Sequence, residues 1–385
     1  MTNHRKTRTA LTALLITFLL SNLSTGQPAR RNLGAFFEKL RAGKPVTVAY
    51  LGGSITAGAG SSDPAKTSYR ALVTQWLRNR YPQAQVNEIN AAVGGTGSVY
   101  GAIRVRRDII AHKPDLVFIE FAAGDAGGPE DAVKKSLEGI IRQLLIVPQP
   151  PEIVLVYAAS ERREARFEWH ELIAQYYQTP AINLQEPTWA LIEAGKITRT
   201  AFWKDGAYPL DEGYKIYANL ITAFLAEQEQ LKASPTLKMI PPLLLSDEMT
   251  YGELKPFAEF QHSPEWRTER INDPALPSAL LISDKVGAQL EVPFDGTAVG
   301  IAYQAGPDCG VVECLIDGKP APAPLTKVDG YDTSHHIRTQ IIAGGLAPGE
   351  HKLTLRLRGE KNLKSSGHHL RLGYLLVGGQ RPERL

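Results

Sequence analysis

The sequence is short of cysteine, of long apolar runs and of net charge, and each shortage excludes a class of protein. Only two of the 385 residues are cysteine, Cys309 and Cys314, so the chain is not a disulfide-rich scaffold. If the segment between them were extended, their Cα atoms would lie about 16 Å apart, whereas a disulfide needs about 7 Å or less. A disulfide would therefore require a bend, and we expect both thiols to be buried packing residues.

Long apolar runs are confined to the N-terminus. Basic residues at positions 5, 6 and 8 precede an apolar run over residues 10–20 and then small and polar residues up to position 26. This pattern predicts a cleavable signal peptide at residues 1–26. The run is too short for a comfortable membrane span, and no other stretch approaches that length. We therefore expect an exported protein without a membrane span, either secreted or periplasmic.

An excess of charge is also missing. The chain has 43 lysine and arginine residues and 40 aspartate and glutamate residues. Removing the three basic residues of the leader leaves 40 of each sign, so the mature chain would be formally neutral. Neutrality argues against nucleic acid as a partner, because nucleic-acid-binding proteins are typically basic. The oligomeric state stays open.

What the sequence does contain is an alternation of apolar strands and amphipathic helices over residues 33–230. Helices are predicted between the strands, and Asp211 is expected to cap the last of them. This order predicts a parallel sheet covered on both faces. The predicted strands are residues 46–50, 86–90, 116–121, 153–157 and 181–184.

The composition changes after residue 230. Residues 231–250 are rich in proline and are predicted to be a linker. From residue 251 to 385, short runs with two-residue alternation, such as 289–292 and 352–358, are separated by turn signals. This pattern predicts an all-β, jelly-roll-like sandwich of seven or eight strands.

Two glycine-containing loops follow predicted strands, and the first carries a serine. Gly52 and Gly53 permit a tight turn at the carboxyl end of the first strand. Such a turn presents the Ser54 hydroxyl at the sheet edge where α/β proteins bind ligands, which suits a nucleophile. A glycine turn with a serine that caps the next helix would give the same pattern. The second loop, residues 94–98, follows the second strand in the same way.

Together these segments resemble the SGNH (GDSL-type) hydrolase superfamily, whose signature is four short blocks at the strand ends of a three-layer α/β/α domain. Residues 53–56 match the block with the nucleophilic serine, at Ser54. Residues 94–98 match the block whose glycine donates a backbone N–H to the oxyanion, and this role falls on Gly95. The resemblance covers residues 45–225, and the β-sandwich is similar to modules attached to carbohydrate-active members. It implies a serine esterase that acts on acylated carbohydrate or another small ester and requires no cofactor.

Two functional side chains of that family are replaced in this chain. The third block supplies an oxyanion asparagine followed by an aspartate, and here Gly124 stands at the asparagine position with Asp125 beside it. In the fourth block Asp205 keeps the acid position, but Tyr208 replaces the base histidine. Imidazole titrates near neutral pH and a phenol near pH 10, and loss of the base from a comparable triad lowers turnover by about 10⁶. Ordinary triad catalysis is therefore expected to be absent.

No other residue is a clear replacement for the base. Lys204 or Lys215 would activate Tyr208 if either lay close, although a tyrosine before proline is typically a packing residue. His170 falls in a predicted helix, where we expect it to be exposed or half-buried. The acids Glu120 and Asp125 lie near the predicted site, but no paired-carboxylate glycosidase geometry is indicated.

Two features of the predicted sandwich are ambiguous. The pairs His335-His336 and His368-His369 could be metal ligands, but adjacent residues of a strand point to opposite faces, so no metal site is expected. Three aromatic side chains either stack on sugar rings or belong to the core, namely Trp266, Tyr303 and Tyr331.

Three hypotheses for the function remain open. The first is an exported, carbohydrate-binding relative of the O-acyl esterases that has lost hydrolysis but keeps its pocket. The second is a working esterase or deacetylase on acylated carbohydrate with a non-standard base. The third is a structural or interaction protein whose β-sandwich holds a partner. Retention of Ser54, Gly95 and Asp205 favours the first two, and the replacements at Gly124 and Tyr208 favour the first.

Overall fold

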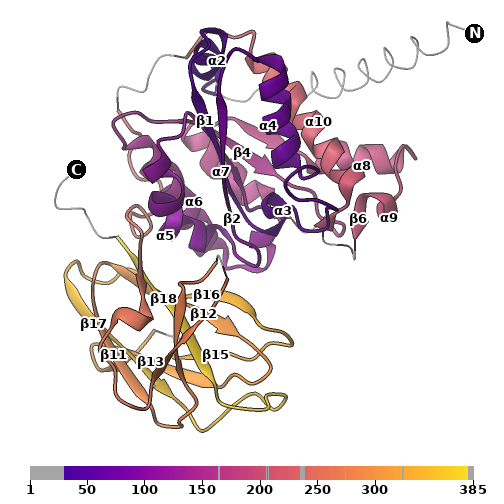
Figure 1. The fold of residues 1–385 in the computed structure, drawn as a ribbon. Helices are drawn as coiled ribbons and strands as arrows, with labels where there is room; N and C mark the ends of the chain where they lie inside the picture. Colours follow the sequence, from indigo (N-terminus) through magenta and orange to yellow (C-terminus); the bar gives the residue numbers. More distant parts are fainter. Residues whose placement is uncertain are drawn as a thin grey trace, which may run out of the picture.

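The computed structural model shows two domains that follow one another along the chain (Figure 1). The predicted signal peptide at residues 1–26 and Asp205 lie outside the residues that the structure describes. None of the helices in the described part is long and apolar enough to cross a membrane. The described residues are 30–163, 165–204, 206, 208–234, 239–273, 275–322 and 325–379.

A five-stranded parallel sheet forms the centre of the first domain, as the alternation of strands and helices predicts. The strand order is β2-β1-β3-β4-β5, and every neighbouring pair is parallel. Strands β1, β3 and β4 are buried along almost their whole length, because the sheet is covered on both faces. The strands are β1 Val46–Gly52, β2 Val86–Ala92, β3 Leu116–Glu120, β4 Glu152–Tyr157 and β5 Ala181–Asn183.

Helices cover the two faces of this sheet and complete a three-layer α/β/α domain (Figure 1). One hydrophobic core contains side chains of α5, α6 and α7, and the other contains side chains of α2, α4, α8 and α10. These helices are α2 Gly34–Arg41, α4 Tyr69–Arg80, α5 Ser98–Asp108, α6 Glu130–Leu145, α7 Phe167–Tyr176, α8 Gln185–Glu193 and α10 Asp211–Gln228. The short elements are α3 Ser54–Ala57, η1 Ile110–His112, η2 Gly124–Gly127, α9 Arg199–Phe202, β6 Trp203–Lys204 and β7 Tyr208–Pro209.

The expected cap of the last helix is wrong. Helix α10 begins at Asp211 itself, and Leu210 occupies the N-cap position without a side-chain hydrogen bond. The Asp211 carboxylate instead accepts hydrogen bonds from the Ser62 N–H and the Thr67 hydroxyl, both at 2.8 Å. These bonds hold the loop that follows α3 against the start of α10.

Two antiparallel sheets form the second domain, which is the predicted β-sandwich. Its described part has eleven strands, so the predicted seven or eight is wrong; β14 and β15 are only two and three residues long, which is too short for alternation to indicate them. One sheet has the order β16-β12-β18-β10-β9 with β8 paired to β18, and the other has the order β11-β17-β13-β14 with β15 paired to β13. Their inner faces share one core that includes Cys314, and both Cys309 and Cys314 are buried and free, as expected of packing residues. The strands are β8 Glu253–Pro256, β9 Arg267–Arg270, β10 Ala279–Ser283, β11 Gln289–Asp295, β12 Ala298–Ala305, β13 Val311–Ile316, β14 Lys319–Pro320, β15 Lys327–Asp329, β16 His336–Ala343, β17 Glu350–Leu357 and β18 Leu370–Gly378; η3 is Phe257–Glu259.

The two domains pack directly against each other through α5. The Tyr100 hydroxyl donates to the carbonyl of Ala275 at 2.9 Å, and Arg107 donates to the Tyr374 hydroxyl at 3.2 Å. Apolar side chains of both domains belong to one core cluster, in which Leu376 of β18 is joined with residues of α5 and α6. The β-sandwich is therefore docked on the first domain rather than merely tethered to it.

The proline-rich segment between α10 and β8 is fixed to α6. The carboxylate of Glu138 accepts backbone N–H groups from Leu244, Leu245 and Ser246 at 2.6–3.1 Å. Its fourth donor is the Tyr177 hydroxyl at 2.6 Å. Four donors satisfy a carboxylate that is 0% exposed, so the segment is anchored by a buried anion.

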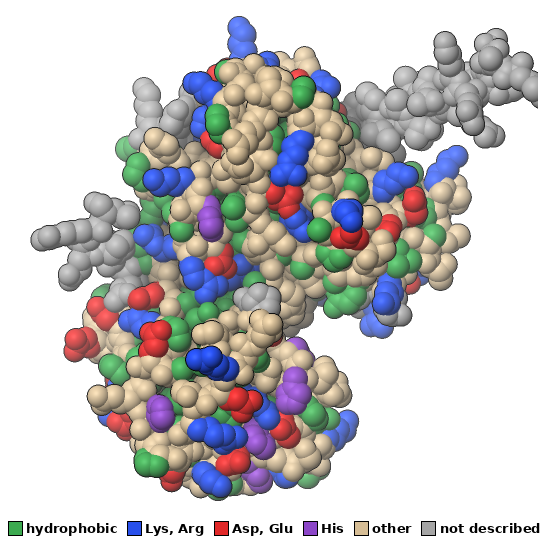
Figure 2. All heavy atoms as spheres, viewed as in Figure 1, with side chains coloured by type: hydrophobic (Ala, Val, Ile, Leu, Met, Phe, Trp, Pro, Cys, Tyr) green, Lys and Arg blue, Asp and Glu red, His purple; other side chains and the backbone are tan. Residues whose placement is uncertain are grey.

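The surface carries charges of both signs. On the face shown in Figure 2, Lys and Arg side chains are interspersed with Asp and Glu over both domains, and histidines gather on the second domain. This face therefore presents no single-sign patch.

Candidate functional site

The serine predicted as a nucleophile sits at the carboxyl end of β1. Gly52 ends the strand, Gly53 is the extended N-cap residue, and Ser54 is the first residue of α3. The turn requires glycine at position 52, because a Cβ there would lie 2.1 Å from Thr56 Oγ1 and 2.8 Å from the carbonyl oxygen of Glu120. We refer to residues 52–54 as the serine loop.

The second glycine-containing segment, residues 93–97, packs against the serine loop, and we call it the glycine loop. A Cβ at Gly94 would lie 3.9 Å from the Ser54 Cβ, and one at Gly53 would lie 3.0 Å from the Thr96 carbonyl. Gly95 has φ +73°, a left-handed conformation that favours glycine. The two loops predicted from the sequence therefore meet at one edge of the sheet, with Ser54 between them.

The end of β3 supplies a third wall of the same site. Glu120 is its last residue, and the chain then passes through Ala123 into η2, which starts at Gly124. A Cβ at Gly124 would meet only the Thr96 carbonyl, at 3.6 Å, which is ordinary van der Waals contact. A Cβ atom is therefore accommodated at Gly124 without a clash.

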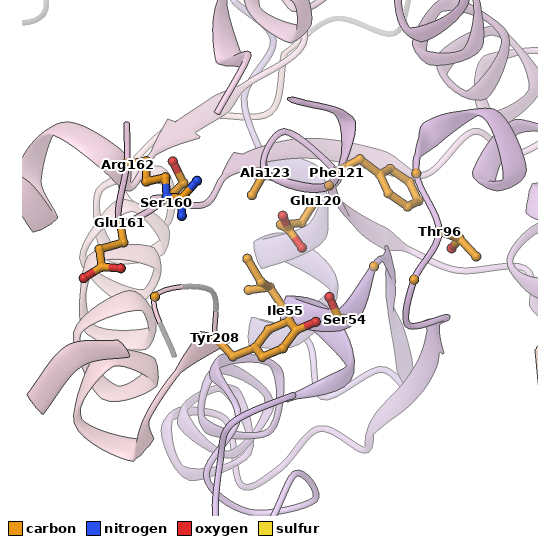
Figure 3. A pocket seen from close by; sticks show the side chains of 15 residues that line it. Ser54, Ile55, Thr96, Glu120, Phe121, Ala123, Ser160, Glu161, Arg162 and Tyr208 are labelled. Atoms are coloured by element: carbon orange, nitrogen blue, oxygen red, sulfur yellow. The ribbon is translucent and has the colours of Figure 1, made fainter. Parts of the chain in front are cut away.

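Tyr208 closes the site on the side of β7. Its side chain is 39% exposed, and Figure 3 shows the ring extending toward Ser54 with the hydroxyl directed at the serine. Asp205, predicted at the acid position, lies outside the described residues. Lys204 is exposed and Lys215 pairs with Glu212 at 3.8 Å, and neither of the two lysines lines the cavity around Ser54.

These residues enclose a cavity of about 500 Å³. It brings together Ser54, Gly95, Gly124 and Tyr208, four of the five residues predicted from the sequence. Sequence reasoning missed the loop after β4, which contributes Ser160, Glu161 and Arg162 on the far side (Figure 3). This loop lies at the carboxyl end of a strand, like the serine loop and the glycine loop. That position was the only feature of the sequence that could have indicated its place in the site.

Glu120 is a buried acid on the wall of this cavity. Its side chain is 2% exposed and accepts a hydrogen bond from Thr56 Oγ1 at 2.9 Å, and Thr56 is in turn bonded to the Tyr69 hydroxyl at 2.8 Å. Burial raises the pKa of the Glu120 carboxyl to about 7, with the charge of Asp125 adding to the effect. The cavity thus contains one carboxyl that exchanges its proton near neutral pH.

Asp125 does not face the cavity but forms a buried pair with His170. His170 Nε2 lies 3.0 Å from Asp125 Oδ2, and the imidazole is 0% exposed, so the expectation of an exposed or half-buried histidine is wrong. The other carboxylate oxygen, Oδ1, accepts the Ser98 N–H at 2.9 Å. The pair therefore holds the end of the glycine loop from behind.

The remaining histidines lie away from Ser54. None of the eight histidines in the described residues lines the cavity, and Ser54 Oγ has no hydrogen bond to an imidazole there. His335 and His369 face Asp308, but no group of three or more ligating side chains in the described chain could hold a metal ion. The ordinary base of a serine hydrolase is absent from the described part of the cavity.

The sandwich aromatics divide between core and surface. Trp266 and Tyr303 are each 3% exposed and belong to the sandwich core, so neither can stack on a sugar ring. Tyr331 is half-buried. The second domain comes close to the site at the glycine loop. The Ile337 carbonyl, at the start of β16, lies 3.7 Å from the position that a Cβ of Gly95 would take.

The sequence of the first domain matches a known family. Residues 50–216 fit the model of the GDSL-like Lipase/Acylhydrolase family, and this range contains every wall of the cavity described above. The sequence matches no curated protein.

Two solved structures share the fold of both domains. One is a two-domain esterase (CEX) active on acetylated mannans, co-crystallised with mannopentaose, with TM-score 0.80, 23% identity, and coverage of 92% of this chain and 97% of that one. The other is a second crystal structure of a two-domain esterase (CEX) active on acetylated mannans, with TM-score 0.79, 23% identity, and coverage of 92% and 98%. The likeness shows that this chain shares the fold and the order of both domains, a three-layer α/β/α domain followed by a β-sandwich, with these two structures.

Proposed function

Because residues 50–216 form a GDSL-like lipase/acylhydrolase domain, we propose that this protein is an exported relative of the carbohydrate O-acyl esterases that binds acylated carbohydrate without cleaving it. One observation supports the proposal above the others. Ser54, Gly95, Gly124 and Tyr208 line a single cavity, yet no described imidazole reaches it. The cavity keeps Ser54 and the groups that would hold an ester, and its described part lacks the histidine base that hydrolysis needs.

The binding half of the site rests on backbone and hydroxyl groups. The N–H groups of Ser54 and Gly95 are the donors that would receive the ester carbonyl oxygen, as an oxyanion hole does. The Ser54 and Tyr208 hydroxyls can each donate and accept hydrogen bonds, and Glu161 and Arg162 add an acceptor and a donor across the cavity. Such a mixed set suits the hydroxyl groups of a sugar ring. The acetylated-mannan activity of the structurally similar esterase makes acetylated mannan the first ligand to try.

The hydrolytic half of the site is incomplete. Hydrolysis would need a base to take the Ser54 proton, and a tyrosine hydroxyl stands where the histidine would be. It would also lack the asparagine amide that stabilises the oxyanion, a loss of about 10²- to 10³-fold when made singly. We therefore expect acylated ligands to bind and to remain intact.

Calorimetric titration tests the binding. We expect acetylated manno-oligosaccharides to bind more tightly than the same oligosaccharides after deacetylation. Gly124→Leu, which places a bulky side chain on the cavity wall, should weaken binding at least about tenfold. Gly127→Leu is the matched control, because Gly127 has open space around it and does not line the cavity. Equal affinity for both ligands, or an affinity that Gly124→Leu leaves unchanged, would contradict the proposal.

A second function is favoured by Glu120, a carboxyl in the same cavity whose pKa burial raises to about 7. In this alternative the protein is an esterase: Ser54 attacks the acyl carbonyl while Glu120 takes its proton, the sugar alcohol leaves with a proton, and water then releases the acid from the acyl-enzyme. The Glu120→Gln and Ser54→Ala variants decide the case. If the native protein hydrolyses an activated acetate ester and both variants do not, this alternative replaces the binding function.

A further inference from the structure

A fully buried arginine lies behind the cavity. Arg104 on α5 is 0% exposed and is among the largest side chains so buried in the described chain. Burying a guanidinium is costly unless its N–H groups are hydrogen-bonded and its charge is paired. The hydrogen-bond partners of Arg104 therefore indicate its structural role.

Two of these partners are backbone carbonyls at the strand ends that carry the serine loop and the glycine loop. Arg104 Nη2 donates to the carbonyl of Gly52 at 3.1 Å, and Nη1 donates to the carbonyl of Ala91 at 2.6 Å. The Gly52 carbonyl also accepts the Val93 N–H at 3.0 Å. One planar side chain thus joins the end of β1, two residues before Ser54, to the end of β2.

The third partner leads toward the second domain. Arg104 Nη1 donates to the Asp108 carboxylate at 3.0 Å, and Asp108 is also paired with Arg107. Although burial opposes ionisation, the hydrogen bonds and charges of Arg107 and Arg104 hold the pKa of Asp108 below its usual value.

Arg107 completes the connection to the β-sandwich. Its Nη1 donates to the Tyr374 hydroxyl at 3.2 Å, and its guanidinium carbon lies 5.4 Å from the centre of the Tyr374 ring. A continuous chain of hydrogen bonds therefore runs from β18 of the second domain, through three charged side chains of α5, to the carbonyl of Gly52.

We propose that Arg104 is a positioning residue that fixes the serine loop and the glycine loop relative to each other, and that Asp108 and Arg107 couple it to the seating of the β-sandwich. The guanidinium presents its donors in one rigid plane, so it fixes two carbonyls and a carboxylate relative to one another, which a flexible ammonium does not. The inference concerns the geometry of the loops, so it stands or falls independently of whether the cavity binds carbohydrate.

Hydrogen exchange measured by mass spectrometry on Arg104→Lys tests the first part. Lysine keeps the charge opposite Asp108 but cannot span both carbonyls. We expect exchange in peptides covering residues 52–58 and 91–98 to become about tenfold faster, as the loss of a charge-assisted hydrogen bond implies. Peptides from β4, which is equally buried, should be unchanged. Unchanged loop peptides, or a uniform acceleration that includes β4, would reduce Arg104 to an ordinary core residue and overturn the proposal.

Tyr374→Phe tests the coupling from the other domain. It removes the hydroxyl that accepts from Arg107 and touches neither loop. We expect exchange in residues 91–98 to become roughly two- to threefold faster. Tyr331→Phe is the matched control in the same domain, because the Tyr331 hydroxyl has no hydrogen bond within the described residues. If the two variants give the same exchange in the glycine loop, the coupling to the β-sandwich is refuted.

Discussion

The Ser54 cavity and the Asp125–His170 pair are neighbouring regions that divide between them the groups of a serine hydrolase. The cavity has a serine, backbone N–H donors and a hydroxyl at Tyr208, but no described imidazole. The pair has an imidazole and a carboxylate 3.0 Å apart, but no serine and no exposure. The difference teaches that the position of a group decides its role: a histidine sealed behind the glycine loop can order that loop but cannot take a proton from Ser54.

The largest expected effect comes from removing the imidazole of the buried Asp125–His170 pair. His170→Ala removes a buried ring and leaves the Asp125 carboxylate without its partner, so we expect the free energy of unfolding to fall by about 3 kcal/mol. Chemical denaturation measures this loss. His112→Ala, at an exposed position, should change stability by less than about 0.5 kcal/mol. Equal effects of the two substitutions would show that the pair has no structural role.

The next prediction concerns the pKa of Glu120, a buried carboxyl on the wall of the cavity. Its pKa is raised from 4.5 to about 7 by burial, so the folded protein binds the extra proton in that interval. Stability from this group is fully present below about pH 4.5 and is lost as the pH rises to about 7, by on the order of 3 kcal/mol.

The Glu120→Gln variant isolates this contribution from the other titrating groups. Gln keeps an acceptor for Thr56 but does not titrate. The difference in unfolding free energy between native protein and variant, measured from pH 4 to pH 8, should move in favour of the variant as the pH rises. A constant difference across that range would mean that burial does not raise the pKa of Glu120.

The smallest expected effect concerns the contact between Gly97 of the glycine loop and Asp125 of the buried pair. A Cβ at Gly97 would lie 2.3 Å from Asp125 Oδ1, so Gly97→Ala should displace the carboxylate and cost about 1–2 kcal/mol of stability. Gly127→Ala has open space around it and is the matched control. Thermal unfolding of the two variants compares them directly, and equal melting temperatures would show that Asp125 moves without cost.

Much of the fold could be predicted from the sequence, because its signals are local. The apolar strand cores and the amphipathic helices between them predict the parallel sheet, and two-residue alternation predicts the sandwich. The short elements α8 and α9 were missed. Their sequences lack a strong apolar stripe, and their place in the fold depends on packing against α10 and the loop after β4.

The candidate site was predicted only in part. Ser54, Gly95, Gly124 and Tyr208 could be placed because each follows a predicted strand or matches a family block, and the structure brings them together. The burial of His170 was missed, although Ile173 and Ala174 at helical spacing mark its face as the buried one.

Other features of the site could not be read from the sequence at all. The partner of His170 is 45 residues away in the chain, and no local pattern indicates such a contact. The same holds for Arg104, whose carbonyl partners Gly52 and Ala91 lie in different strands.

The most direct test of the central claim is to restore the two replaced side chains. Hydrolysis of an activated acetate ester and of acetylated mannan would be measured for the native protein, for the double variant Gly124→Asn/Tyr208→His, and for that variant with Ser54→Ala added. A binding protein with a disarmed esterase site predicts a silent native protein and a gain of at least about 10²-fold in the double variant that disappears with Ser54→Ala. Turnover by the native protein that is lost in its own Ser54→Ala variant would contradict the account and make the chain a working esterase.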